Sequence, residues 1–418
     1  MKRLLLALLI AVPANASVLH LSVNQMIHPI SEEFIERGLA QADRQHDAAV
    51  ILEMSTPGGL LDSTRDIVEK IMTSPVPVIV YVAPAGSRAA SAGFFILESA
   101  DIAAMAPGTN TGAAHPVVFG EKVDDIMKAK MENDAAAFMR TIAARRGRNV
   151  AVAESAVRES KSFTEQEALN QKLIDVIAAD VPSLLRAIDG RAIRRYNGSV
   201  VTLKTAGAPI TQYEMTLKEK VLSVLMDPNI AFLLLVLGGL AIMAEFNHPG
   251  ATIPGVTGVV SILLALFALN LLPTRYAALV LLLAAFALFA LEAKYAAHGV
   301  LGIGGVICMI FGGLFLVDGP IPEMRVQLGT ALGVSLAIGA IAVFLMTIAL
   351  RARRLRVTTG REGMIGEIGV ARTALGPEGK VFVHGELWNA TARASIAEGT
   401  RIRVAGVNGL HLMVEPAE

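Results

Sequence analysis

The chain has 418 residues, enough for two or three domains, and 53% of them are hydrophobic. Because that share exceeds what soluble proteins carry, part of the chain is expected to lie in a membrane. Lysine and arginine number 37, as do aspartate and glutamate, so no net charge indicates nucleic acid or an acidic substrate. The single cysteine, Cys308, excludes an internal disulfide and a thiolate metal cage and argues against cysteine catalysis.

The first sixteen residues have the pattern of a secretory signal peptide. A basic start, Lys2-Arg3, precedes the apolar run Leu4–Val12, and Ala14-Asn15-Ala16 is the small-residue step after which cleavage is expected. An uncleaved anchor is the alternative. In either case, residues 17 to about 225 are predicted to leave the cytoplasm.

Residues 18 to 181 alternate short β-rich runs with stretches in which apolar residues recur at helical spacing. This alternation predicts an α/β domain with a largely parallel sheet. The expected strands are Val18–Val23, Ala49–Met54, Val76–Val82 and Ile102–Ala106, and the expected helices are Glu32–Arg44, Leu60–Met72 and Asp124–Arg145. A β-hairpin is expected over Arg191–Lys204, with its turn at Asn197-Gly198.

After Asp227-Pro228 the composition changes to five apolar runs: Ile230–Ala244, Val256–Leu272, Ala277–Leu291, Val300–Val317 and Leu328–Leu350. Some are shorter than the ~20 residues that an unkinked membrane span needs. Four arginines follow within residues 351–356, and basic residues beside a span mark its cytoplasmic side. An exported amino-terminal domain and a cytoplasmic arginine cluster require an odd number of spans. Five spans are therefore predicted, with three as the alternative.

Residues 360–418 are polar again and predict a small closed barrel of five short strands, similar to an OB-fold. The β-rich runs are Gly363–Ala371, Lys380–Val383, Arg401–Val404 and Leu410–Val414. An OB-fold that binds nucleic acid exposes aromatic side chains for base stacking, and this segment offers Phe382 and Trp388 alone. A protein–protein or membrane-surface role is expected instead, with no nucleic acid as partner.

Ser91 lies among residues too small to cover its side chain, in the segment Gly86–Gly93. A serine hydroxyl acts as a nucleophile where its surroundings expose it, take its proton and stabilise the oxyanion that its attack creates. About thirty residues earlier, the segment Ser55–Gly59 forms a second small-residue turn. Gly58 and Gly59 can turn backbone N–H groups toward that oxyanion without a side chain in the way. Together the two segments predict a membrane-tethered serine hydrolase.

Six short segments, taken in this order, carry a resemblance to a known family: Ser55–Gly59, Gly86–Gly93, Met105–Thr109, Gly112–Pro116, Asn133–Ala135 and Gly147–Asn149. The chain resembles the long form of the NfeD proteins, membrane-bound serine proteases of the ClpP/crotonase superfamily. The resemblance implies a signal peptide over 1–16, a ClpP-like α/β serine protease domain over 17–225, transmembrane helices within 229–350 and an OB-fold-like domain over 359–418.

The resemblance also implies a cellular setting. It implies hydrophobic peptide substrates, a stomatin/prohibitin-like membrane protein as partner, contact with membrane lipid, and a homodimer or larger homo-oligomer. The protein is expected in a bacterial-type inner membrane, with the protease domain exported and the C-terminal domain cytoplasmic. No histidine spacing typical of a zinc site and no phosphate-binding glycine loop is present, so neither a metal nor another cofactor is expected.

For catalysis the resemblance implies a dyad in which Ser91 is the nucleophile and Lys130 the base. Gly58, Gly59 and the amide of Ala92 would hold the oxyanion. A lysine accepts the serine proton when it is neutral, so burial in an apolar pocket is expected to lower its pKa. Spacing alone favours the interpretation of Lys130 as a solvated lysine on a charged helix face, and the resemblance reverses that preference.

Three alternatives stay open. Lys128 is a second candidate for the base. A ClpP-type triad is also possible in sequence, because His115 lies 24 residues after Ser91 and Asp175 sits in the turn Leu173–Val176. The third alternative is a non-catalytic scaffold in which the C-terminal domain binds a stomatin-type partner.

Overall fold

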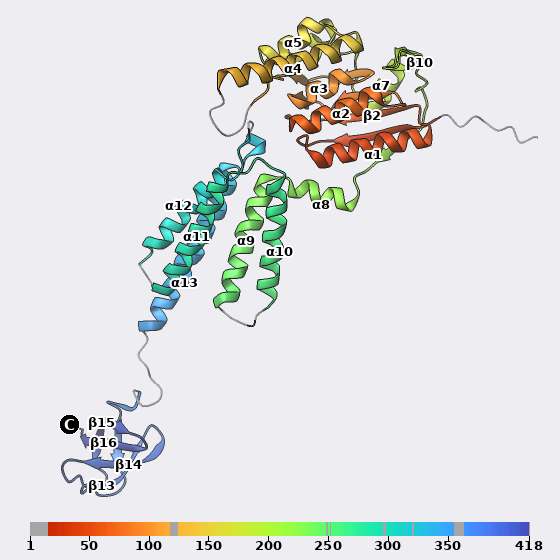
Figure 1. Cartoon of the computed structure of the whole chain (residues 1–418). Helices are drawn as coiled ribbons and strands as arrows, with labels where there is room; N and C mark the ends of the chain where they lie inside the picture. Colours follow the sequence, from red (N-terminus) through yellow and green to blue (C-terminus); the bar gives the residue numbers. More distant parts are fainter. Residues whose placement is uncertain are drawn as a thin grey trace, which may run out of the picture. The chain divides into compact units, whose positions relative to one another are not determined.

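A six-stranded parallel sheet forms the centre of the amino-terminal α/β region in the computed structural model of the chain (Figure 1). The strand order is β11-β1-β2-β3-β5-β8, and every neighbouring pair is parallel. The bounds are β1 Val18–Val23, β2 Ala49–Met54, β3 Val78–Val82, β5 Ile102–Met105, β8 Val176–Ile177 and β11 Ile210–Tyr213. Parallel strands buried on both faces are nearly continuous apolar runs. This is why β1, β2, β3 and β5 are predictable from sequence, whereas the two-residue β8 and the polar β11 are not.

The structure describes residues 16–117, 124–247, 250, 252–295, 298–319, 322–354 and 363–417, without the side chains of 247, 322, 345, 346 and 349–354. The predicted signal peptide, except its last residue, and the side chains of the arginine cluster lie outside this description. Two compact units, Met1–Gly339 and Ala340–Glu418, divide the chain, and each is described by itself. The domain boundaries expected from the sequence stay predictions.

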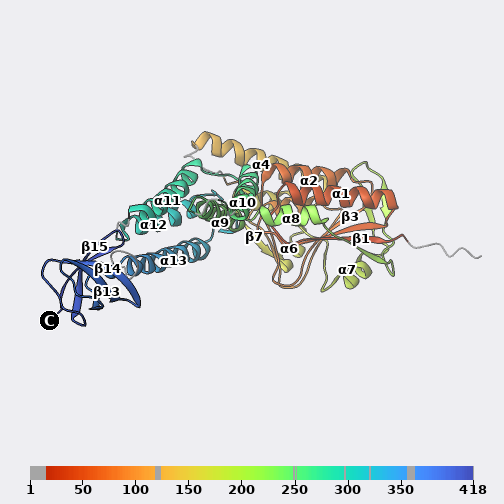
Figure 2. The same ribbon diagram turned by 90° about the horizontal axis from the view of Figure 1, so that it is seen from below.

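Helices and a hairpin cover the two faces of the sheet. One face packs against α1 Pro29–Gln45, α2 Leu61–Thr73, α3 Ala92–Ser99, α4 Asp125–Arg146 and α5 Val150–Arg158. The other face packs against α7 Val181–Ile188 and the predicted hairpin, which pairs β9 Ala192–Arg194 with β10 Val200–Thr202. Figure 2 shows α1, α2 and α4 on one side of the sheet and α7 on the other. Burial on both faces makes this region a doubly covered α/β layer.

A small second sheet, for which the sequence gives no signal, orders the segment that carries Ser91. Its strands are β4 Arg88–Ala90, β6 Asn110–Gly112 and β7 Ser162–Thr164. Strand β4 pairs parallel with β6, and β6 pairs antiparallel with β7. Three-residue strands carry too little apolar alternation to be recognised locally. The short α6, Glu165–Asn170, follows β7.

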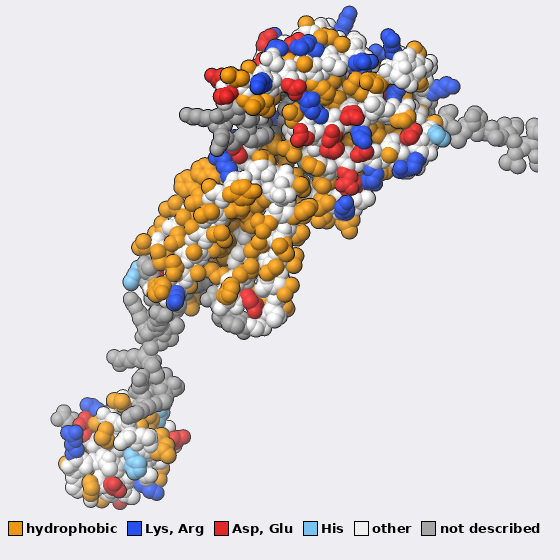
Figure 3. Space-filling model, viewed as in Figure 1, with side chains coloured by type: hydrophobic (Ala, Val, Ile, Leu, Met, Phe, Trp, Pro, Cys, Tyr) orange, Lys and Arg blue, Asp and Glu red, His pale blue; other side chains and the backbone are white. Residues whose placement is uncertain are grey.

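Five apolar helices follow at the five predicted runs, after the linking helix α8 Leu217–Leu225. They are α9 Pro228–Asn247, α10 Ile253–Asn270, α11 Tyr276–Tyr295, α12 Val300–Leu314 and α13 Leu328–Arg354, with a 3-10 turn η1 at Pro322–Met324. We call α9 to α13 with η1 the membrane block. Its surface is largely apolar on the face that Figure 3 shows, as expected of side chains that face lipid.

Within the described residues, three of these helices are long and apolar enough to span a membrane alone: Pro228–Phe246, Ile253–Asn270 and Tyr276–Tyr295. Val300–Leu314 and Leu328–Phe344 are shorter apolar helices. The close packing of α9 against α10 relies on glycine, because a Cβ on Gly258 of α10 would lie 2.8 Å from the carbonyl oxygen of Gly238 on α9. The chain is therefore a membrane protein, and its span number stays a prediction of five, with three as the alternative.

The second compact unit contains the predicted closed barrel, with strand order β12-β13-β14-β16-β15. Its bounds are β12 Ile368–Ala371, β13 Glu378–Val383, β14 Glu386–Ala392, β15 Arg401–Asn408 and β16 His411–Pro416. The sequence gives no separate signal for β14, on which Trp388 packs against the barrel core. Phe382 is partly exposed, with the Arg372 guanidinium over its ring.

Candidate active site

Ser91 stands at a sharp turn between β4 and α3. Its φ is 52° and its ψ is −112°, a conformation that a residue with a side chain rarely adopts. The turn is held by two backbone hydrogen bonds, from Ser91 N–H to the Gly112 carbonyl (2.9 Å) and from Phe94 N–H to the Ser91 carbonyl (3.0 Å). Residues in such strained conformations cluster at functional sites, where the surrounding contacts hold the backbone in place despite the strain.

The small residues around Ser91 are required by close packing. A Cβ on Gly93 would lie 2.6 Å from the Thr56 Cγ2, so a larger residue there would push α3 away from the Ser55–Gly59 loop. Thr56 joins that loop to β4, because its N–H donates to the Arg88 carbonyl (2.7 Å) and its carbonyl accepts from Ala90 N–H (3.1 Å). The two small-residue segments singled out in the sequence are therefore adjacent in the fold.

Gly58 abuts Ser91 directly. Its φ is +129°, and a Cβ there would lie 2.9 Å from the Ser91 Cβ and 3.3 Å from the Ser91 Oγ. The Gly58 N–H donates to the Thr56 Oγ1 (3.2 Å) within its own turn. Gly59 serves a different contact, since a Cβ there would lie 2.1 Å from the Ile27 carbonyl oxygen. Both glycines are required sterically, and Gly58 is the one that faces the serine.

Lys130 lies near the start of α4 with an exposed side chain. The expected burial of this lysine is not found in the single chain. Among the described residues no hydrogen bond or ion pair joins Lys130 to Ser91, and residues 118–123, just before α4, lie outside the description. Lys128 is also exposed and pairs with Asp125 (3.6 Å).

The two remaining predicted residues, His115 and Asp175, do not form a pair. The Nδ1–H of the half-buried His115 donates to the Val157 carbonyl (2.9 Å), which leaves Nε2 as the acceptor nitrogen. The Asp175 carboxylate instead binds two arginines, Arg148 (3.1 Å) and Arg191 (2.9 Å).

The position of Asp175 in the sheet explains why it cannot orient His115. Its carboxylate accepts from the N–H of Ala103 (2.8 Å), which lies at the amino end of β5. The loop that supports Ser91 instead follows the carboxyl end of β2. Because all six strands are parallel, these ends lie at opposite edges of the sheet. Ser91, His115 and Asp175, the triad considered as an alternative, therefore do not come together in this structure.

A buried carboxyl group lies on α3, the helix that begins after Ser91. Both carboxylate oxygens of Glu98 are buried without a hydrogen-bond partner among the described atoms. Burial raises the pKa of Glu98 to about 8, although the Arg148 Nε, 3.7 Å away, favours the charged form. Burial therefore favours the protonated form of this carboxyl group, which has no counterpart in the sequence-based predictions.

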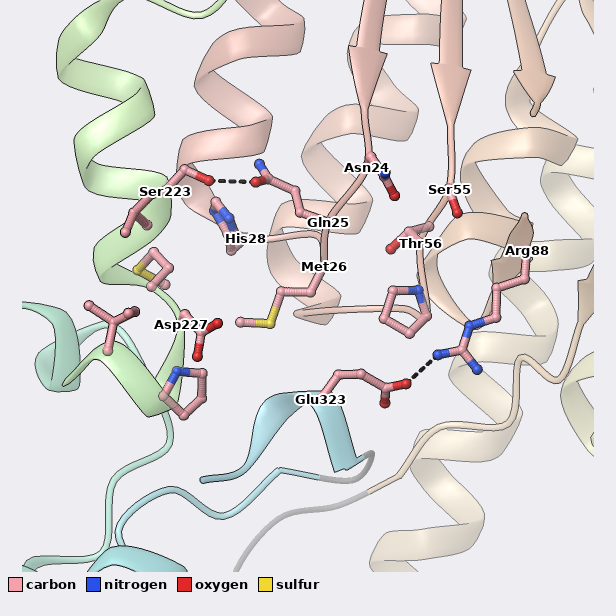
Figure 4. A pocket seen from close by; sticks show the side chains of 15 residues that line it. Asn24, Gln25, Met26, His28, Ser55, Thr56, Arg88, Ser223, Asp227 and Glu323 are labelled. Atoms are coloured by element: carbon pink, nitrogen blue, oxygen red, sulfur yellow. Dashed lines mark hydrogen bonds and ion pairs between the residues drawn. The ribbon is translucent and has the colours of Figure 1, made fainter. Parts of the chain in front are cut away.

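A cavity of about 590 Å³ lies beside the Ser55–Gly59 loop (Figure 4). Its lining residues are 24–26, 28, 55–57, 88, 223, 224, 226–228, 230 and 323, which come from segments far apart in the sequence. Arg88 of β4 donates to the Glu323 carboxylate of η1 (2.5 Å), as Figure 4 shows. Sequence reasoning missed these residues because no local pattern links the segments.

Comparison with known proteins shows which family the chain belongs to. Residues 17–184 match the NfeD1b N-terminal domain, 229–348 the NfeD integral membrane domain, and 361–416 the NfeD-like C-terminal, partner-binding domain. A membrane-bound protease of Pyrococcus horikoshii is 32% identical over 434 residues, which cover 99% of this chain and 98% of that protein. The chain belongs to the NfeD family. Within this NfeD protein, the amino-terminal α/β domain corresponds to the NfeD1b N-terminal domain.

Two solved structures are similar to the amino-terminal half of this NfeD protein. One is a membrane-bound stomatin-specific protease with a lysine-to-alanine substitution, in complex with a substrate peptide; it is 31% identical, covers 50% of this chain and 98% of its own, and has a TM-score of 0.48. The other is the same kind of protease with a serine-to-alanine substitution; it is 30% identical, covers 49% of this chain and 100% of its own, and has a TM-score of 0.46.

Proposed function

We propose that this NfeD protein is a membrane-anchored endopeptidase that cleaves apolar segments of membrane-associated proteins, with Ser91 as nucleophile. The observation that carries the proposal is the contact of Gly58 with Ser91 at a strained strand-to-helix turn. Packing of this kind leaves the hydroxyl uncovered and lets a peptide carbonyl approach. A relative that is 31% identical over the same domain is specific for a stomatin, which supports a membrane-associated substrate.

In the proposed reaction the Ser91 Oγ attacks the scissile carbonyl carbon, and Lys130 takes the hydroxyl proton. The resulting oxyanion is held by the amides of Gly58, Gly59 and Ala92, and the Gly58 N–H gives up its hydrogen bond to the Thr56 Oγ1 (3.2 Å) to do so. When the carbon–nitrogen bond breaks, the leaving amine takes the proton from Lys130 and an acyl-enzyme remains. A water molecule then attacks the acyl carbon and gives a proton to Lys130. When the bond between the acyl carbon and the Ser91 Oγ breaks, Lys130 returns that proton to the Oγ and the new carboxyl end of the peptide leaves.

This mechanism requires that another surface cover Lys130 and exclude water from its side chain. The side chain is exposed in the single chain, and a neutral lysine at neutral pH requires desolvation. A second protease domain packed on α4 would supply it, consistent with the predicted homodimer. The lysine-to-alanine substitution in the complex of a relative with its substrate peptide supports a lysine with a role in turnover.

A specific observation favours His115 as the second candidate for the base. Its Nδ1–H is fixed by the Val157 carbonyl, so its Nε2 carries the lone pair that a general base needs. In this version a backbone carbonyl takes the orienting role that Asp175 would have in a ClpP-type triad.

The C-terminal barrel is proposed to bind a stomatin-like membrane protein on the cytoplasmic side. The support is its match to an NfeD-like partner-binding domain over 361–416. The protease domain is proposed to be exported, because a secretory signal precedes it and an arginine cluster follows the last apolar run.

A labelling experiment tests the nucleophile. A fluorescent fluorophosphonate should label the full-length protein in detergent, and Ser91→Ala should lose the label. Ser87→Ala is the matched control, since Ser87 lies in the same small-residue segment but is buried, and it should keep the label. An unlabelled native protein, or label retained by Ser91→Ala, would reject the proposal and favour the scaffold.

A further inference from the structure

The cavity beside the active-site loop is shared by the protease domain and the membrane block (Figure 4). The protease domain contributes Met26 and Pro57 to its lining, and helix α8 contributes Val224. Met226 lies just before α9, where the chain enters the membrane block, and Glu323 belongs to η1 between α12 and α13. Its volume of about 590 Å³ lies within the range of sites that bind organic ligands.

The cavity lies next to the catalytic serine along both supporting strands. Pro57 directly precedes Gly58, and Arg88 precedes Ser91 by three residues. Thr56 and Ala89 are paired as a parallel bridge, so the two wall segments are fixed to each other. Because an extended chain advances about 3.3 Å per residue, these wall residues lie within about 10 Å of the nucleophile along the strands. A substrate with its scissile bond at Ser91 reaches the cavity two or three residues further along.

The walls suit an extended, apolar polypeptide. Met26, Val224 and Ile230 provide apolar surface, and Val224 is 57% exposed. Asn24 adds an amide group that can pair with a peptide backbone. The adjoining α9 begins at Pro228 and is the first of the helices long enough to span a membrane, which places the cavity at the membrane surface.

The membrane-block wall is held in place by several contacts. The Arg275–Asp318 ion pair (2.6 Å) joins the start of α11 to the segment after α12, and Gln327 N–H donates to the Asn229 Oδ1 (2.9 Å). Met324 of η1 is fully buried. The Arg88–Glu323 ion pair then connects this wall to β4, the strand that directly precedes Ser91. The site is thus formed before a substrate arrives.

We propose that this cavity is a substrate subsite built jointly by the protease domain and the membrane block. It receives the apolar residues that lie between the scissile bond and the membrane in a membrane-anchored protein substrate. The inference rests on the proposed function and adds to it: the membrane helices take part in substrate recognition, in addition to anchoring the protease. It also gives a reason for fusing the two parts into one chain.

Filling the cavity tests the inference. Val224→Trp places a large side chain in it, and the KM for a fluorogenic peptide of leucine and valine residues should rise about tenfold, with kcat within about twofold. Val221→Trp is the matched control, because Val221 lies one turn earlier on α8, is 50% exposed and does not line the cavity. Equal KM values in the two variants would overturn the proposal.

A crosslinking experiment tests whether the peptide binds in the proposed subsite, independently of turnover. A photoreactive amino acid is placed at position 224 or 221 of the full-length Ser91→Ala protein, together with a biotinylated form of the same peptide. Capture at 224 alone is expected, and equal or absent capture at 224 rejects the subsite. Fluorophosphonate labelling of Val224→Trp separates the two hypotheses, because normal labelling leaves the proposed function standing even where the subsite fails.

Discussion

Gly58 and Ser91 come from loops after different strands, and a Cβ on Gly58 would lie 2.9 Å from the Cβ of Ser91. This approach depends on the Thr56–Ala89 bridge, which sets the register of the two segments. It ties the glycine turn and the serine turn into one site that neither forms alone.

Gly58→Ala should abolish peptide cleavage, with a loss of more than about 100-fold in kcat/KM. The new methyl group would displace Ser91, and a shift of about 1 Å at a reacting atom can cost that much. Gly86→Ala is the control, because its φ of +87° is equally unfavourable for alanine but nothing lies within 4 Å of its Cβ position. Comparable activity losses in the two variants would show that backbone strain, rather than contact with Ser91, is responsible.

Lys130→Ala should reduce turnover as severely as Ser91→Ala, while His115→Ala should keep much of the activity. The pH–rate profile gives a second measurement: a lysine base places the acidic limb well above the value of about 6.5 at which an ordinary histidine titrates. A reversed ranking, with a limb near 6.5, would assign the base to His115. Lys128→Ala controls for the general loss of positive charge on α4.

Reversing the Arg88–Glu323 ion pair should show whether the membrane block positions the serine strand. Glu323→Arg is expected to lower kcat about tenfold by placing two cations together, and Arg88→Glu should act likewise. The double variant restores opposite charges and should recover most of the loss. Because both side chains are nearly half exposed, global stability should change by less than about 1 kcal/mol. Failure of the double variant to recover activity would contradict a positioning role.

Glu98→Gln should stabilise the protein at alkaline pH. The pKa of Glu98 is raised by burial to about 8, so the native state holds a proton that the unfolded state loses above about 4.5. Its stabilising contribution is therefore present below pH 4.5 and is lost as the pH rises through 8. The thermal midpoint of Glu98→Gln in detergent should match the native protein near pH 5 and exceed it at pH 8.5, where the free energies of unfolding should differ by a few kcal/mol at most.

The exposed Glu33 of α1 provides the control for this experiment. Glu33→Gln should leave the pH dependence of the thermal midpoint unchanged. If Glu98→Gln instead loses stability at every pH, the carboxylate is a necessary partner of Arg148, and the assignment of a protonated buried acid is wrong.

The orientation of the chain is tested with reporter fusions. Alkaline phosphatase should be active when fused at residue 200 and inactive at residue 418, and a cytoplasmic fluorescent reporter should give the opposite pattern. The reason is the cost of moving an arginine cluster across the membrane after the last span. Activity on the same side at both positions would mean an even number of spans, and the barrel would share a compartment with the protease domain.

The sequence by itself determined the elements whose signals are local. Val18–Val23 and Ala49–Met54 are apolar runs that match β1 and β2 in full, and the Asn197-Gly198 turn predicted the hairpin. The small-residue segments around Gly58 and Ser91 were also recognisable in the sequence, because two backbones can approach closely only where the residues between them are small. The five apolar runs did so because lipid selects for composition along a continuous stretch.

The tertiary structure alone decided which of these residues meet. Strands β4, β6 and β7 exist because distant segments pair, and three residues cannot encode that pairing locally. The same dependence placed Asp175 with two arginines at the far edge of the sheet, left Lys130 exposed, and brought Arg88 to Glu323 across 235 positions of sequence. Contacts of this range follow from strand order and helix packing, which belong to the whole fold and to no single motif.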